Sequence, residues 1–77
     1  MENISERITI DQNICNGKPT IKGTRITVQT ILDFLSSGDS NEEILKQYPS
    51  IDADDIKACI KFAADLMNRN FIIKSVV

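Results

Sequence analysis

The residues best suited to chemistry lie in one short stretch, Gly17 to Ile26, with the sequence GKPTIKGTRI. It combines glycines, threonine hydroxyls and cations, which are groups that contact phosphates in proteins. A nucleotide-binding P-loop requires Lys-Ser/Thr directly after its second glycine, whereas Gly23 here precedes Thr24 and Arg25. The pattern therefore favours an ordered loop over a nucleotide site, with positive φ at the glycines and a backbone restricted by Pro19.

The charges of this loop point to nucleic acid as a binding partner. The segment from Arg7 to Arg25 carries four cations and one carboxylate, whereas the segment from Asp39 to Asp55 carries six carboxylates and one lysine. The net charge of -2 thus hides a basic part and an acidic part. We expect phosphate contacts from side chains of the basic loop. These candidates are Lys18, Lys22, Thr24 and Arg25.

Catalysis is disfavoured by what the sequence lacks. Histidine, the commonest general base and transition-metal ligand, is absent. Cys15 and Cys59 are too far apart in sequence for a Cys-x-x-Cys pair or a zinc ribbon, and we expect both to be reduced. The carboxylates cluster at two predicted helix starts, where capping explains them better than a metal site does. We therefore predict a chain without enzymatic activity, small-molecule substrate, cofactor or metal, and keep a hydrolase or nuclease only as a third hypothesis.

The elements that must position the loop begin with a strand. Ile8 and Ile10 alternate with Thr9, which predicts a short half-buried strand over 7–11. The loop then predicts a return to a second short strand near 25–28.

Local capping signals predict three helices after the loop. Thr27 is an N-cap for a helix that ends near Ser37, before Gly38. Ser40 and Glu43 form a capping box for a second helix, ended by Pro49, and Asp52 caps a third helix. The apolar face of the first helix comprises Val28, Ile31, Leu32 and Leu35, and that of the third comprises Ile56, Cys59, Ile60, Ala63, Leu66 and Met67.

These elements predict a mainly α fold: a three-helix helix-turn-helix domain, homeodomain-like or winged-helix-like, with a short N-terminal β-segment. We expect one domain over 1–77, divided into strand and loop (1–26), three-helix unit (27–69) and apolar tail (70–77). No apolar run approaches the ~20 residues needed to cross a bilayer, so we expect a cytoplasmic protein that does not bind membranes.

A partner interface is expected at two apolar features. Phe34 lies off the core-facing side of the first helix, and the tail contains Phe71, Ile72 and Ile73. The tail either folds back onto the predicted strand or the third helix, or supplies a strand to a second copy or to a toxin. The sequence does not separate these alternatives.

The whole pattern resembles the small prokaryotic proteins grouped as domain of unknown function 433, often described as antitoxin-like. The resemblance covers about four-fifths of the chain and runs through ITID (8–11), GKPTIKGTRITV (17–28), ILDFLSSG (31–38), EEILKQYP (42–49) and DIKACIKFAA (55–64). It implies a homeodomain-like or winged-helix-like fold and a toxin partner of the PIN-like nuclease class. It implies no catalytic residue.

The leading hypothesis is accordingly an antitoxin-like binding module, a homodimer that neutralises a PIN-like toxin and also contacts operator DNA. The alternative is a helix-turn-helix transcriptional regulator without a toxin. Readout by the third helix is disfavoured in either case, because Asp52, Asp54 and Asp55 at its start would face a polyanion. DNA contact is expected from the basic loop instead. The acidic part could meet a basic, RNA-binding surface of the partner.

Overall fold

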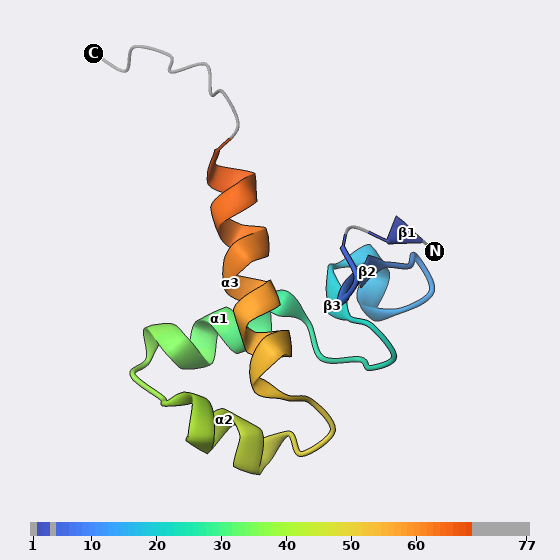
Figure 1. Cartoon of the computed structure of the whole chain (residues 1–77). Helices are drawn as coiled ribbons and strands as arrows, with labels where there is room; N and C mark the ends of the chain where they lie inside the picture. The colour runs from blue at the N-terminus through green and yellow to red at the C-terminus, as the bar shows by residue number, and fades with distance from the viewer. Residues whose placement is uncertain (1, 4, 69–77) are drawn as a thin grey trace, which may run out of the picture.

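The computed structural model describes residues 2–3 and 5–68 (Figure 1). A small β-segment precedes three helices. Its elements are β1 (Glu2–Asn3), β2 (Ile8–Ile10), the 3-10 turn η1 (Cys15–Gly17) and β3 (Thr20–Ile21). The helices are α1 (Val28–Ser36), α2 (Asn41–Gln47) and α3 (Ala53–Met67). The predicted mainly α class with an N-terminal β-segment is confirmed.

The sheet is antiparallel, with β2 between β1 and β3. Ile8 lies opposite Ile21, and Thr9 lies opposite Thr20. The predicted strand over 7–11 is confirmed as β2, but the second strand near 25–28 is wrong. The partner of β2 comes before the turn at Gly23, and after the turn only Thr27 forms an isolated bridge, with Thr20. Residues beyond Thr27 belong to α1 because the Thr27 side chain already accepts a hydrogen bond from the Thr30 backbone N–H.

The predicted helix boundaries are confirmed, because each rests on a short-range hydrogen bond. The α1 helix ends in a Schellman motif, with Gly38 at φ +97° and the Asp39 N–H bonded to the Phe34 carbonyl. Ser40 and Glu43 form the expected capping box at the start of α2. The α3 helix is capped by Asp52, which forms a capping box of its own with Asp55.

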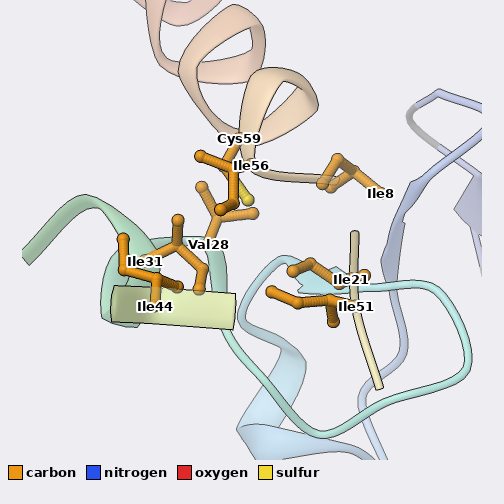
Figure 2. Packing of buried hydrophobic residues seen from close by; sticks show 8 residues of the cluster. All are labelled: Ile8, Ile21, Val28, Ile31, Ile44, Ile51, Ile56 and Cys59. Atoms are coloured by element: carbon orange, nitrogen blue, oxygen red, sulfur yellow. The ribbon is translucent and has the colours of Figure 1, made fainter. Parts of the chain in front are cut away.

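The core lies where the sheet meets the three helices (Figure 2). Isoleucines dominate it, and Figure 2 shows Ile56 and Cys59 of α3 directed toward the side chains of α1 and β2. Ile51, in the turn between α2 and α3, also belongs to the core, although no periodic pattern predicted it. The buried apolar residues are Ile8, Ile21, Val28, Ile31, Ile44, Ile51, Ile56 and Cys59.

The predicted core face of α3 is only half right. Ile56 and Cys59 are completely buried, but Ile60, Leu66 and Met67 are 49%, 44% and 69% exposed. The α1 helix has nine residues and α3 has fifteen, so the last turns of α3 extend beyond their neighbours (Figure 1). Among the described residues, no helix is long and apolar enough to cross a membrane.

Candidate functional site

The basic loop is a tight, internally bonded structure. Gly17 and Gly23 both have φ +79°, as expected, and Cys15 and Asn16 also have positive φ. The Thr24 hydroxyl donates to the Ile21 carbonyl at 2.8 Å and accepts from the Ile26 N–H at 3.0 Å. Its proton is therefore already used within the turn, so Thr24 is a weaker phosphate donor than its residue type suggested.

The three cations of the loop lie in different surroundings. Lys18, Lys22 and Arg25 are exposed, and none forms an ion pair within the part of the chain that the structure describes. Lys22 lies beside β2, since its N–H donates to the Arg7 carbonyl at 2.8 Å. Lys18 borders a separate depression that also includes Cys15. That these residues bind nucleic acid stays a prediction.

Arg7 was counted with the basic part of the sequence, but the structure places it against the acidic part. One guanidinium nitrogen lies 2.9 Å from Asp55 and 3.1 Å from Asp52, and the other lies 3.7 Å from Asp54. The hydrogen bond to Asp55 raises the pKa of Arg7. Asp52 accepts the Asp55 backbone N–H, which lowers the pKa of Asp52, and the Arg7 charge lowers it further. The ion pairs of Arg7 therefore connect the basic segment of the sequence to the acidic one.

This ion-pair cluster could not be read from sequence spacing, because Arg7 and Asp52 are 45 residues apart. Through these ion pairs Arg7, the residue before β2, connects that strand to the start of α3. The first turn of α3 keeps an excess of carboxylates over cations, which does not suit insertion into a DNA groove. Within residues 5–68, no group of three histidine, cysteine, aspartate or glutamate side chains is arranged to hold a metal ion.

The two cysteines are free thiols in different settings. Cys59 is completely buried, and burial together with the Asp55 charge raises the pKa of its thiol to about 11. A thiol with so high a pKa is protonated near neutral pH and is a poor nucleophile. The thiol of Cys15 is partly exposed and donates to the Arg25 carbonyl at 3.3 Å.

A concave surface between the segment 5–7 and α3 was not predicted. We call it the α3 groove. One wall is the segment 5–7, and the other is the side of α3 that carries Phe62 and the exposed Leu66; its volume is about 420 Å³. Lys61 and Asp65 form an ion pair of 2.8 Å at its edge. The lining residues are Ser5, Glu6, Arg7, Ala58, Lys61, Phe62, Asp65 and Leu66.

The predicted interface residues fare differently. Phe34 is half-buried, packs against the core and meets Tyr48 edge-to-face, with 5.9 Å between ring centroids. Much of its surface is therefore already used by this chain. Phe71, Ile72 and Ile73 lie outside the described residues.

Comparison with known proteins identifies the family. The family described as "Protein of unknown function (DUF433)" matches residues 8–63, which extend from β2 to the middle of α3. The chain belongs to the DUF433 family. This confirms the resemblance seen in the sequence, whereas the family description is silent on the antitoxin-like character.

Two DUF433 relatives place the chain in context. A crystal structure of a DUF433 member protein from Anabaena variabilis superposes with a TM-score of 0.75 at 29% identity, covering 80% of this chain and 61% of that one. The uncharacterized protein y4eO of Sinorhizobium fredii is 33% identical over 58 residues, or 75% of this chain. The chain spans 26% of the length of y4eO, so that protein contains much more than this domain.

Proposed function

We propose that this DUF433 chain is a non-catalytic, antitoxin-like module that binds a PIN-like nuclease through the α3 groove. The observation that carries the proposal is the groove itself. The aromatic ring of Phe62 and the exposed side chain of Leu66 line it, and the Lys61–Asp65 pair forms a polar edge. An apolar centre with a polar rim is the usual composition of a protein–protein interface.

The proposal of a binding role is supported by how the chemically capable groups are used. The carboxylates of Asp52 and Asp55 cap α3 and hold Arg7. The Cys59 thiol is buried and protonated. The chain has no histidine. The two carboxylates and the thiol therefore stabilise the fold. An inhibitor that works by occupying the surface of another protein needs a stable fold and no catalytic group.

The nuclease class of the partner is taken from the family resemblance, and charge supports it. Glu42 and Asp54 are exposed, and carboxylates outnumber cations at the starts of α2 and α3. A nuclease presents a basic surface to its RNA substrate. An acidic module would be attracted to that surface and would block substrate access.

The proposal is tested by co-expressing the chain with the product of the neighbouring gene and analysing the mixture by size-exclusion chromatography. We expect a heteromeric complex. Leu66→Asp places a charge in the groove and should weaken binding at least about tenfold, as measured by calorimetry. Gln29→Asp introduces the same charge at an exposed position of α1 and should bind like wild type. Absence of a complex, or equal binding by Leu66→Asp, would overturn the proposal.

A second candidate function is DNA binding, as an autoregulating antitoxin or a helix-turn-helix regulator without a toxin. It is favoured by the exposed Lys18, Lys22 and Arg25, which have no ion-pair partner among residues 5–68. A gel-shift titration with the upstream DNA tests it. Each lost phosphate contact should lower the slope of log K against log salt by about 0.9. Alanine at all three positions should therefore flatten the slope, whereas Lys46→Ala should not. Salt-independent binding, or none, would exclude this function.

A further inference from the structure

The turn before β3 contains a reactive peptide unit that neither proposed function uses. Among the asparagines of the sequence, only Asn16 is followed by a glycine. Asn16 is exposed and belongs to η1. The side-chain carbonyl of an asparagine can be attacked by the backbone nitrogen of the next residue, and a glycine has no Cβ to obstruct that approach. Asn13 and Asn41 are also exposed, but Ile14 and Glu42 follow them.

We propose that Asn16 is a site of spontaneous deamidation, which converts it to aspartate or isoaspartate. The Gly17 nitrogen forms a bond to the side-chain carbon Cγ of Asn16. The bond from Cγ to the amide nitrogen breaks, and ammonia leaves with the proton of the Gly17 N–H. Water then opens the succinimide ring at either carbonyl group, giving aspartate or isoaspartate. Water is the only co-reactant, and nothing is oxidised or reduced.

The native turn controls when this reaction can occur. Asn16 has φ 58° and ψ 33°, and the Gly17 N–H donates to the Ile14 carbonyl at 3.1 Å. That hydrogen bond holds the proton that must leave before the nitrogen can attack. The reaction therefore requires local opening of η1. This turn contains no buried residue, and segments of that kind open more often than the core does.

Both products change the loop around Lys18. Asn16 and Lys18 line the same depression, so a carboxylate at position 16 offsets the positive charge of Lys18. Isoaspartate also lengthens the main chain, because its Cβ becomes part of it. The hydrogen bonds from Gly17 to Ile14 and from Lys18 to Cys15 both close across residue 16, so the longer chain puts them out of register. No residue of η1 lines the α3 groove, so the inference is independent of the proposed nuclease partner.

Peptide mapping by mass spectrometry tests the site. The folded chain is incubated in mildly alkaline buffer, and deamidation is detected as a mass increase of about 1 Da, because a hydroxyl replaces the amide NH₂. We expect conversion at Asn16 to be at least about tenfold faster than at Asn13 or Asn41, which serve as internal controls. Equal rates at the three asparagines would overturn the proposal, as would an unchanged Asn16 after a time in which the unfolded chain converts completely.

Unfolding tests the role of the turn. In guanidinium chloride, conversion at Asn16 should be at least about tenfold faster than in the folded chain, because the Gly17 N–H is no longer bonded to Ile14. Gly17→Ala should slow the reaction in the unfolded chain, where the strain of a positive φ no longer applies. Gly23→Ala is the matched control and should leave the rate unchanged. Equal rates in the folded and unfolded chains, or no effect of Gly17→Ala, would contradict the mechanism.

Discussion

The two halves of α3 share one amphipathic pattern but have opposite surroundings. The first half, 53–59, is capped by Asp52 and held by Arg7, and it supplies Ile56 and Cys59 to the core. The second half, 60–67, exposes the apolar residues that continue the same face. A helix pattern therefore identifies an apolar face without saying which molecule covers it. The first half serves the stability of this chain, and the second half is suited to contacts with other chains.

The comparison is tested most directly by equal truncations in the two halves. Ile56→Ala should cost about 3 kcal/mol of unfolding free energy, because it leaves a cavity in a fully buried site. Ile60→Ala, one turn later, should cost less than about 1 kcal/mol because its side chain is half exposed. Urea unfolding of dilute protein measures both values. Equal losses would mean that Ile60 contributes to the core of a single chain.

The ion-pair cluster at the start of α3 should make this half sensitive to acid. The pKa of Asp52 is lower in the folded chain than its ordinary value of 3.8. Its stabilising contribution is therefore complete above about pH 4 and is lost as the pH falls through the lower, folded value. Asp52→Asn keeps a capping side chain but does not titrate, so stability should decline less below pH 4.

Thermal melts between pH 2 and 7 check this prediction, with Asp65→Asn in the second half as control. The control should lose stability in acid as wild type does. If Asp65→Asn changed the acid profile as much as Asp52→Asn, the contrast between the two halves would be wrong.

Cys59 should make the same half sensitive to alkali. Burial raises the pKa of its thiol from 9.0 to about 11. The protonated thiol is thus favoured by folding, and this contribution is present below pH 9 and is lost as the pH rises from 9 toward 11. Cys59→Ala should be less stable at pH 7 but should lose less on going to pH 11. Paired urea titrations measure the difference, and Cys15→Ala should retain the full wild-type loss.

The smallest effect is expected at the ion pair of the second half. Lys61 and Asp65 are both well exposed, although they are 2.8 Å apart. An exposed pair four residues apart on a helix contributes about 0.3–0.5 kcal/mol, so Lys61→Ala should lower stability by no more than that. Thermal denaturation at low and high salt checks the value. A loss above about 1 kcal/mol would show that this half also holds the fold together.

Much of the helical architecture was predictable because helix ends depend on neighbours in sequence. Thr27, Ser40 and Asp52 each cap a helix through a backbone N–H three residues later, so residue types and spacing were sufficient. The strand at Ile8–Ile10 was predictable from its alternation. The strand that pairs with it was predicted too late in the sequence. The turns near Gly17 and Gly23 are close to each other, and the chain could have paired with the first strand after either turn.

The candidate site was less predictable. The sequence directed attention to the loop cations, but the groove forms from the segment 5–7 and the side of α3 near Phe62, which are more than fifty residues apart. Ile51 entered the core from a turn, where periodicity gives no signal. The sequence grouped Arg7 with the cations of the basic segment, whereas in the structure it pairs with carboxylates at the start of α3. Each of these outcomes depends on which elements meet in space.

The amino-acid sequence by itself determined the family, the class of fold and the starts of the three helices, since these depend on motifs and contacts a few residues long. Only the tertiary structure decided which apolar residues are buried, where the charge of Arg7 is used and which face of α3 remains open. The physical reason is that burial and ion pairing are properties of distance in space, and a fifteen-residue helix beside a nine-residue one leaves uncovered surface that residue types alone do not reveal.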